Sequence, residues 1–346
     1  MRQLDFDKCP DCEPTFSDRG CLYYDAATNP AECGFCKRTI YYRCLADIRG
    51  IIPLSYSSVQ NFLTCHQLYY LTAIRGFRVK AAMKSDALKD GTLWDAVITK
   101  YLGGTTRTGQ PININDIIEE NEIVPKEVAK VKAIFRAYKT LAIQVDPGAD
   151  IQSKIDLKIP FNKEWGNGYP VELLVTGYYD RRYPDSFVDN KLSGRPDFYL
   201  DLFHIQSQMG TYFLADPQLK ECTMEVIRRP DLKEGKTHKD ETVESFEERC
   251  YQDILSRPSH YFIGWNKETK RYGKKFFRTE FDLNEVHDRY KHVFRELFEA
   301  RMCNGWYKND RVCGQILPGI PCALLPVCRY NNMSETVFEI RDRDSL

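Results

Sequence analysis

The sequence predicts an α/β protein, and the periodicity of its apolar residues is the main reason. Residues 171–177 are apolar and rich in β-branched side chains, as in a buried strand, and 186–193 form a second predicted strand. Segments 125–143 and 284–302 instead repeat apolar residues every three or four positions, which is typical of helices that cover a core. A third feature is a cysteine-dense stretch over residues 1–50.

Composition sets broad limits on function. Among 346 residues, 49 are Lys or Arg and 49 are Asp or Glu, so the net charge is zero and any nucleic-acid binding would depend on a local basic groove. No apolar run is long enough to span a bilayer, and the N-terminus lacks the pattern of a signal peptide. We therefore expect a cytoplasmic protein with no membrane partner. In a reducing compartment, 13 cysteines favour metal ligation over disulfides.

Residues 1–50 are predicted to form a small zinc-ribbon-like module. Two CxxC pairs lie about twenty residues apart, and each pair aims two thiolates at one point, as a tetrahedral Zn²⁺ site requires. So small a module would draw its folding energy from the metal. An iron–sulfur site and thiols that bind no metal are the alternatives. The expected ligands are Cys9, Cys12, Cys33 and Cys36, with Cys21 and Cys44 as substitutes.

Two carboxylates and a lysine follow the predicted strands. Asp180 comes just after the first strand, while Asp189 and Lys191 alternate onto one face of the second. Carboxylate oxygens on adjacent strands suit a hard cation such as Mg²⁺ or Mn²⁺. The lysine would orient a water molecule or offset negative charge on a phosphate. The alternative is an exposed hairpin with an ordinary ion pair between Asp189 and Lys191.

An ordered set of short motifs resembles the RecB-like branch of the PD-(D/E)xK nucleases. It consists of Gly-x-x-Asp at the strand end, Asp-x-Lys on the next strand, and Gln-x-x-x-Tyr on a helix predicted over 197–214. The resemblance covers about residues 52–330 and implies a restriction-endonuclease-like mixed sheet flanked by helices. It also implies that Gln208 and Tyr212 border the active site, although Tyr212 could instead pack in the core. The residues that carry it are Gly177, Asp180, Asp189, Lys191, Gln208 and Tyr212.

One position departs from the family pattern. Many relatives carry a metal-binding histidine four residues after a glycine on an amphipathic helix, predicted here over 89–102. In this chain the glycine is Gly91 and the fourth residue after it is Asp95. Aspartate is a competent ligand for a hard metal, so the resemblance implies a third carboxylate ligand with a changed metal preference. The alternative is an acid of the first helical turn, favoured by the helix dipole.

A second set of cysteines flanks the predicted nuclease core. Cys65 lies on a helix expected to start near Val59 after a serine cap at Ser55 or Ser57, and by itself would be a core thiol. The later cysteines resemble the closing ligands of iron–sulfur exonucleases in this superfamily, including the CRISPR-associated RecB-like exonuclease and phage nucleases. The resemblance implies a 4Fe–4S cluster that ties the helix to the C-terminal region. Its ligands would be Cys65, Cys313, Cys322 and Cys328, with Cys303 able to replace Cys313 and zinc as the alternative metal.

The remaining predictions concern loops, one strand and a basic hairpin. We expect a strand at 220–229, loops at 103–123 and 230–242, and a hairpin of strands at 260–265 and 272–283. Tyr272 and Phe276 could stack a base beside a basic turn that holds a phosphate backbone, or the turn could be merely solvated. The basic residues are Lys267, Lys270, Arg271, Lys274 and Lys275.

Together these features predict a zinc module at 1–50, a nuclease domain at 51–330 and a polar tail at 331–346. The expected function is a metal-dependent DNA nuclease, most simply an exonuclease on single strands or duplex ends in recombination, repair or phage DNA metabolism. Partners would be DNA and a helicase or recombination protein, in the host cytoplasm if the gene is phage-encoded. The alternatives are a non-cleaving nucleic-acid- or partner-binding module, or a nuclease active only within a helicase or CRISPR adaptation complex.

Overall fold

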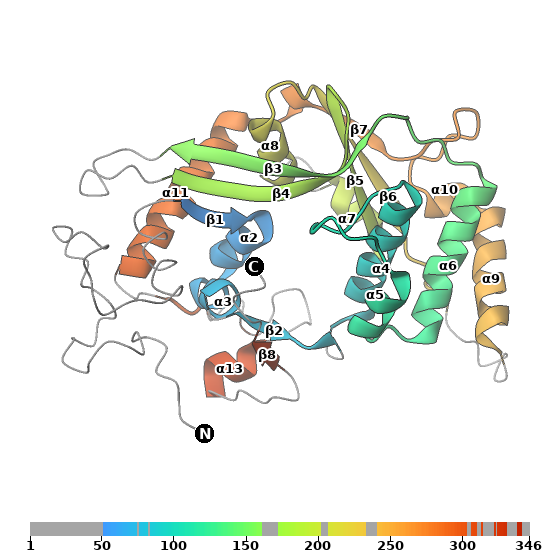
Figure 1. Cartoon of the computed structure of the whole chain (residues 1–346), viewed down its shortest axis with the longest axis horizontal. Helices are drawn as coiled ribbons and strands as arrows, with labels where there is room; N and C mark the ends of the chain where they lie inside the picture. Colours follow the sequence, from blue (N-terminus) through green and yellow to red (C-terminus); the bar gives the residue numbers. More distant parts are fainter. Residues whose placement is uncertain are drawn as a thin grey trace. The chain divides into compact units, whose positions relative to one another are not determined.

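The structure is a computed structural model that describes residues 51–74, 76–81, 84–160, 172–201, 207–232, 241–302, 306–309, 313, 322, 324–330 and 338–340 (Figure 1). The expected zinc module with Cys9, Cys12, Cys33 and Cys36 lies outside the described residues, as do Cys303 and most of the expected tail. Within the described ranges, no helix combines the length and apolar character needed to cross a membrane.

The chain has an α/β fold in which helices flank a mixed sheet, as the sequence predicts. In the described part of the chain, six strands form one sheet in the order β1–β4–β5–β6–β7, and β3 also pairs with β4. The β1–β4 and β5–β6 pairs are parallel, whereas β4–β5 and β6–β7 are antiparallel. The strands are β1 (Ile51–Ser55), β3 (Asp150–Pro160), β4 (Glu172–Arg182), β5 (Ser186–Ser193), β6 (Glu221–Arg228) and β7 (Lys274–Phe277).

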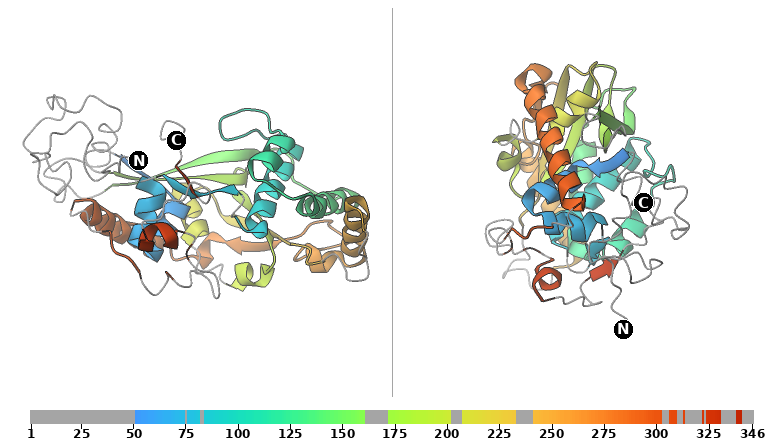
Figure 2. Two further views of the ribbon diagram at one scale, coloured as in Figure 1. Left: turned by 90° about the horizontal axis from the view of Figure 1, so that it is seen from below. Right: turned by 90° about the vertical axis from the view of Figure 1, so that its left-hand side faces the viewer.

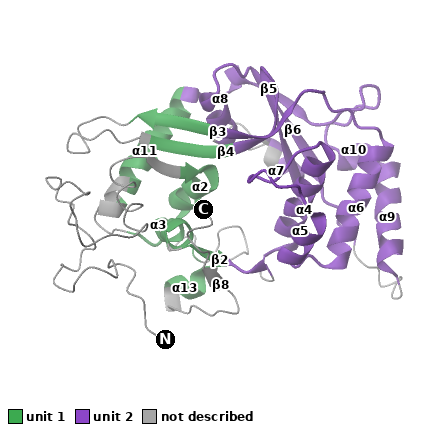
Figure 3. Ribbon diagram, viewed as in Figure 1, with its two compact units in different colours: residues 1–78, 156–177, 284–346 green, residues 79–155, 178–283 purple. Residues whose placement is uncertain are grey.

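The chain divides into two compact units (Figure 3). Unit 1 comprises residues 1–78, 156–177 and 284–346, and unit 2 comprises residues 79–155 and 178–283. Strand β4 passes from unit 1 into unit 2 between Gly177 and Tyr178. All carboxylates of the predicted nuclease site therefore belong to unit 2, and all described cysteines of the predicted cluster belong to unit 1.

The described part of unit 1 starts with β1, followed by helix α2 (Tyr56–Thr64), whose N-cap is Ser55. The Ser55 hydroxyl accepts a hydrogen bond from the Ser58 N–H at 3.1 Å, which confirms one of the two predicted caps. The chain continues through α3 (His66–Tyr69) and a π-helical turn (Tyr70–Ile74). Much later it returns in α11 (Leu283–Met302), where Glu296 lies 3.8 Å from His66, so distant segments are neighbours (Figure 2). Unit 1 also holds α13 (Leu325–Tyr330) and β8 (Phe338–Ile340), which pairs with β2 (Phe77–Val79).

Unit 2 has two hydrophobic clusters. The first joins α4 (Asp86–Tyr101), α6 (Pro125–Thr140), α9 (Val243–Ser256) and α10 (Pro258–Tyr261) around the buried Trp94 and Tyr138. Helices α6 and α9 lie side by side (Figure 1), and Arg136 pairs with Glu247 and Glu248 across them, at 2.9 Å each. The second cluster packs α8 (Ser207–Ala215) on the sheet through buried Phe187, Phe213 and Met224. The short α7 (Pro196–Asp201) precedes α8.

Two sequence predictions about elements are wrong. The stretch 103–123 is not all loop, because α5 (Ile114–Glu120) begins after the N-cap Asn113, whose side chain accepts from the Asn115 N–H at 3.1 Å. No strand forms at 260–265, where Pro258 instead starts α10 and only isolated bridges follow, such as Ile227 with Phe262. The predicted strands at 186–193 and 220–229 are confirmed as β5 and β6, and the helix at 284–302 is confirmed as α11.

Candidate active site

Asp180 and Asp189 come together where β4 and β5 separate. The antiparallel ladder pairs Arg182 with Phe187 and Arg181 with Val188, and its next step would place Asp180 opposite Asp189. At that step the Asp180 Oδ2 accepts the Asn190 N–H at 2.7 Å, in the place of a backbone carbonyl. Strand β4 continues to Arg182, so Asp180 lies inside the strand and not just after it, as the sequence predicts. The divergence of the strands leaves room for the two carboxylates.

Lys191 lies beside Asp189 on β5. Its Nζ is 2.7 Å from Asp189 Oδ2, a close ion pair that lacks the geometry of a directed hydrogen bond. The Asp189 side chain is only 4% exposed, whereas that of Lys191 is 26% exposed. Desolvation lowers the pKa of Lys191, but the charges of Asp189 and Asp180 outweigh it and the net shift is upward. Lys191 is therefore a permanent cation, and the pair is not the exposed surface contact that the sequence leaves open.

Asp95 reaches the same group of charges from α4. Its side chain keeps contact with solvent, yet the protein around it is dense enough that desolvation raises the pKa of the Asp95 carboxyl. Positive charge on Arg107 and Lys191 opposes that rise, and negative charge on Asp189 adds to it. Helix α4 starts at the N-cap Ser85 and places Asp95 in its third turn, too far from the N-terminus for the helix-dipole interpretation. Asp95 therefore lies close enough to Asp189 and Lys191 on β5 to interact with both electrostatically.

The pKa of the Asp180 carboxyl is strongly raised. Desolvation is the main cause that raises its pKa to about 7, and the charges of Asp189 and Asp95 add to the rise. Lys191 and the Asn190 N–H act in the opposite direction without cancelling it. Asp180 is therefore only partly ionised near neutral pH.

These residues match a hard divalent cation in chemistry and charge. Three aspartates offer oxygen ligands, and one of these oxygens, Asp189 Oδ2, lies 2.7 Å from the Lys191 ammonium. In the ranges that the structure describes, however, no group of three or more His, Cys, Asp or Glu side chains is arranged so that it could hold a metal ion. The donor set therefore fits Mg²⁺ or Mn²⁺, while its arrangement is not that of a closed coordination shell.

Gln208 and Tyr212 lie one helical turn apart on α8. The Gln208 side-chain amide donates to the Tyr212 hydroxyl at 2.8 Å, and that hydroxyl donates to the Tyr178 carbonyl at 3.2 Å. Tyr212 is 6% exposed, and its ring packs edge-on against Tyr179 and Phe187. Desolvation, followed by the charge of Asp189, raises the pKa of Tyr212, so the phenol stays neutral. The pair contacts β4 two residues before Asp180.

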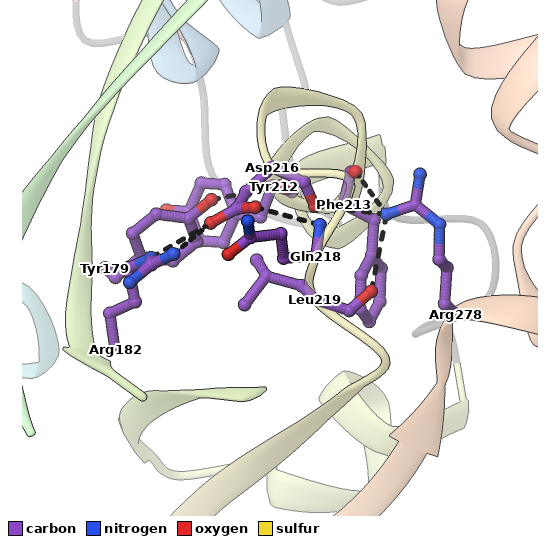
Figure 4. A network of polar contacts seen from close by, with 8 residues as sticks. All are labelled: Tyr179, Arg182, Tyr212, Phe213, Asp216, Gln218, Leu219 and Arg278. Atoms are coloured by element: carbon purple, nitrogen blue, oxygen red, sulfur yellow. Dashed lines mark hydrogen bonds and ion pairs between the residues drawn. The ribbon is translucent and has the colours of Figure 1, made fainter. Parts of the chain in front are cut away.

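Helix α8 is anchored at its C-terminal end by a polar network (Figure 4). Tyr179 donates to the Tyr212 carbonyl at 3.0 Å, and Arg182 pairs with Asp216 through an Nε–Oδ2 contact of 3.0 Å. Arg278 donates to the carbonyls of Phe213, Asp216 and Leu219 at 2.5, 3.2 and 3.4 Å. Two strand residues and one arginine thus hold α8, which fixes Gln208 and Tyr212 against β4.

Sequence reasoning missed two residues of this group. Asn190 stands between Asp189 and Lys191, and only its backbone donor to Asp180 matters, so its side chain gives no signal. Arg107 lies in a Thr- and Gly-rich loop, where its guanidinium carbon is 4.8 Å from the centre of the Tyr178 ring. No periodicity or motif marks such a loop residue. Only the fold brings it to the carboxylates.

In unit 1, the described cysteines of the predicted cluster are linked through a short connecting segment. Cys65 adopts an extended conformation between α2 and α3, and its Sγ accepts the Asn309 N–H at 3.4 Å. The Asn309 side chain also donates to the Thr64 carbonyl at 3.0 Å. The Cys313 N–H donates to the Asn309 carbonyl at 3.1 Å, and the Cys322 N–H donates to the Cys313 carbonyl at 3.2 Å.

The thiols of this set also interact with one another. Desolvation raises the pKa values of Cys322 and Cys328, and the nearby Cys65 and Cys313 raise both further. None of the four forms a disulfide. Four thiols near one another, one of them accepting a backbone N–H, are chemically suited to an iron–sulfur cluster or zinc. As stated above, they do not form a group that could hold a metal ion in the present arrangement.

The basic turn of the predicted hairpin does not have the expected surface. Tyr272 is 5% exposed and Phe276 is fully buried, so neither ring is available to stack a base. Arg271 pairs with Asp146 at 2.8 Å, and Lys275 pairs with Glu221 at 2.7 Å. Packing against Tyr138 and β6 has taken the aromatic rings inward, and the prediction of a base-stacking site here is wrong.

Comparison with known proteins gives no family assignment. No protein-family model matches the sequence, and no curated protein is similar to it at a significant level. The functional conclusion therefore depends on the chemistry of the site and on the motif order in the sequence.

Proposed function

We propose that the protein is a metal-dependent nuclease that hydrolyses phosphodiester bonds in DNA. One observation carries the proposal: Asp95, Asp180, Asp189 and Lys191, from three separate elements, act on one another electrostatically within unit 2. An ordinary surface ion pair would not lie beside two further carboxyls whose pKa values are raised by desolvation. The order Asp, Asp-x-Lys, Gln-x-x-x-Tyr supports a PD-(D/E)xK nuclease of the RecB-like type with a restriction-endonuclease-like core.

In this proposal the protein residues have distinct roles. Asp180 and Asp189, with Asp95 as the third ligand, would hold Mg²⁺ or Mn²⁺. Lys191 remains protonated, so it can orient the attacking water or stabilise charge on the phosphate, but it cannot act as a general base. The Tyr212 hydroxyl donates a hydrogen bond to the Tyr178 carbonyl, so its role would be to position β4. When bound, the cation would activate water and stabilise the leaving oxygen.

The cysteines of unit 1 support a second, structural cofactor. We propose that Cys65, Cys313, Cys322 and Cys328 hold a 4Fe–4S cluster, with zinc as the alternative. The cluster would join the α2–α3 corner to the C-terminal segment, which already contacts Cys65 through Asn309. Such ligation closes a long loop and so restricts the unfolded chain. The zinc module at residues 1–50 remains a prediction from the sequence.

The substrate and setting follow from the nuclease proposal. An exonuclease on single strands or duplex ends, acting in recombination, repair or phage DNA metabolism, is the form we propose. A helicase or recombination protein is the proposed partner, and the cytoplasm the proposed site of action.

The direct test uses end-labelled DNA and anaerobically purified full-length protein. Single- and double-stranded substrates are incubated with Mg²⁺, Mn²⁺ or EDTA, beside the variants D189A and K191A. We expect degradation with metal, none with EDTA, and a loss of at least about 100-fold in each variant, since oriented electrostatic contributions are of that size. The product ladder gives the polarity. A wild-type protein that leaves DNA intact under every metal would contradict the proposal.

A second function, a non-cleaving nucleic-acid-binding module, is favoured by one observation. The Lys191 ammonium already lies on Asp189 Oδ2, and no described group could hold a metal ion as placed. In that case wild type and K191A would bind DNA alike and neither would degrade it. A nuclease that needs a helicase or CRISPR adaptation complex would instead become active when the partner is added.

A further inference from the structure

We propose that Arg107 is a phosphate-binding residue of this site, held on the Tyr178 ring so that its guanidinium binds the substrate backbone beside the carboxylates. This inference rests on the proposed nuclease function and deepens it. It assigns a protein residue to bind the DNA backbone, a role that none of the motif residues fills.

The first step is the position of Tyr178 on β4. Tyr178 and Asp180 lie two residues apart on β4. The Arg107 guanidinium carbon lies 4.8 Å from the centre of the Tyr178 ring. Arg107 therefore lies beside the strand that carries Asp180. The proximity of Asp95 agrees, since the charge of Arg107 is the strongest influence that lowers the pKa of the Asp95 carboxyl.

The loop that holds Arg107 is ordered by its own hydrogen bonds. The Thr106 N–H donates to the Gln110 carbonyl at 2.8 Å, and the Gly109 N–H donates to the Thr106 carbonyl at 2.8 Å. The Gln110 N–H also donates to the Thr106 hydroxyl at 3.0 Å. Gly109 supplies the positive φ of 79° that this tight turn needs. The turn presents Arg107 at its tip, with the side chain exposed.

Among the residues that the structure describes, Arg107 has no carboxylate as an ion-pair partner. Most other arginines of unit 2 are neutralised, for example Arg136 by Glu247 and Glu248, and Arg257 by Asp253. Arg107 forms no ion pair within 4.0 Å with any residue in the described ranges. A guanidinium that stacks on a ring keeps its planar fork of N–H donors available for a phosphate. Here the guanidinium is close enough to Asp95 that its charge lowers the pKa of that carboxyl.

The test measures DNA binding without cleavage, so that it does not depend on an active enzyme. Full-length wild type and R107Q are titrated in EDTA with a fluorescein-labelled single strand and its duplex, by anisotropy at several salt concentrations. R107Q should bind about 10- to 100-fold more weakly. The slope of log affinity against log salt should fall by about 0.7 for the single strand and about 0.9 for the duplex, as for one lost phosphate contact. An abasic strand should show the same change, because phosphate contacts do not read bases.

A matched control is available on α6. Arg136 also stacks on a tyrosine, 4.2 Å from the centre of the Tyr251 ring, but two glutamates neutralise it. R136Q should leave the affinity and the salt slope unchanged. R107K should keep the slope but lose part of the affinity, since lysine keeps the charge without the planar fork. Y178L should mimic R107Q, and the double variant should be little worse than either, because the two side chains act as one unit.

The outcomes separate the two proposals. If wild type cleaves DNA but R107Q keeps the wild-type salt slope, or R136Q loses as much affinity as R107Q, the role of Arg107 is overturned and the nuclease stands. If cleavage by R107Q shows a raised KM with kcat retained, together with the smaller slope, the inference is supported. If wild type neither binds nor degrades DNA, both proposals fail.

Discussion

At the scale of single residues, the site is defined by charges that burial makes unfavourable. Asp180 lies where β4 and β5 diverge, and its pKa rises from 3.8 to about 7, chiefly through desolvation. An acid in that state destabilises the metal-free protein whenever it is ionised. Such a position is a reason to expect a functional site, because a purely structural one would gain from an uncharged residue.

Replacing Asp180 by asparagine should therefore stabilise the metal-free protein, with a characteristic pH dependence. The folded pKa lies above the unfolded one, so wild-type stability falls as pH rises between about 4 and about 7. In EDTA, the Tm advantage of D180N over wild type should be small near pH 4, grow up to pH 7 and then level off. With Mg²⁺ or Mn²⁺ the advantage should shrink, because only wild type gains a ligand.

A control of opposite sign tests the reasoning. Desolvation raises the pKa of Asp253, but hydrogen bonds from Arg257 and Tyr261 hold it below its usual value overall. D253N should therefore lower the Tm at neutral pH, and the difference should vanish as the solution is acidified below the pKa values of that group. A D180N protein that is less stable than wild type at pH 8 in EDTA would contradict the account of Asp180.

At the scale of elements, α4 and α8 position the site through contacts made away from it. On α4, the fully buried Asp90 pairs with Arg229, which follows β6 and also lies 2.7 Å from Glu127 of α6. Desolvation, the main cause, raises the pKa of Asp90 to about 7, and the Arg229 charge opposes the rise. This buried group fixes the helix that carries Asp95.

Replacing Arg229 should destabilise the protein. R229M leaves Asp90 buried without its cation, while Glu127 keeps the Lys130 ammonium at 2.9 Å, and the free energy of unfolding should fall by about 3–5 kcal/mol in a urea titration. The double variant D90N/R229M should recover part of the loss. R228M, at the adjacent position, removes a 3.4 Å pair with the exposed Asp197 and an exposed 3.2 Å hydrogen bond to the His260 carbonyl, and should cost less than R229M, about 1 kcal/mol.

Arg278 should stabilise α8 in particular. It donates to three carbonyls at the end of that helix, so R278Q should reduce stability by about 1–3 kcal/mol through unsatisfied acceptors. Hydrogen exchange should speed up in α8 more than in α6. Equal protection loss in both helices would indicate a global effect and would contradict the anchoring role of Arg278.

Elements also show where sequence reasoning succeeds. The strand carrying Asp189 and Lys191 is confirmed to its ends, because alternation and turn residues bound it. Helix α9 was not expected, although Thr242 caps it and Phe246, Cys250 and Ile254 repeat every fourth residue. Strand β3 was likewise missed, because its buried residues Ile155 and Ile159 are sparse among charges. The burial of Tyr272 could not be predicted, since whether an aromatic ring faces solvent or core depends on tertiary packing.

At the scale of the whole molecule, the two proposed metal sites belong to different units. The carboxylates lie in residues 79–155 and 178–283, and the cysteines lie in 1–78 and 284–346. The sequence predicts a single nuclease domain over 51–330 that contains both sets, and the boundaries of the units, set by contacts between distant segments, could not be read from it.

The cysteine set can be tested independently of DNA cleavage. Anaerobically purified full-length protein should be brown and contain iron and acid-labile sulfide, and C65S, C322S or C328S should each lose most of the iron. C250A, which changes a buried free thiol of unit 2, should keep it. A colourless wild type that contains only zinc, even after reconstitution with iron and sulfide, would contradict the cluster and leave zinc as the metal.

The discontinuity of unit 1 has a consequence for biosynthesis. A ribosome finishes every residue of unit 2 while the segment 284–346 is still to be made. At about 5–20 residues per second, that last segment takes about 3–13 s. During this interval the nascent chain holds Asp95, Asp180 and Asp189 but only the first of the four proposed cluster cysteines. The carboxylate site can therefore take shape on the ribosome before the cysteine set exists, and delivery of iron would be a late, post-translational step.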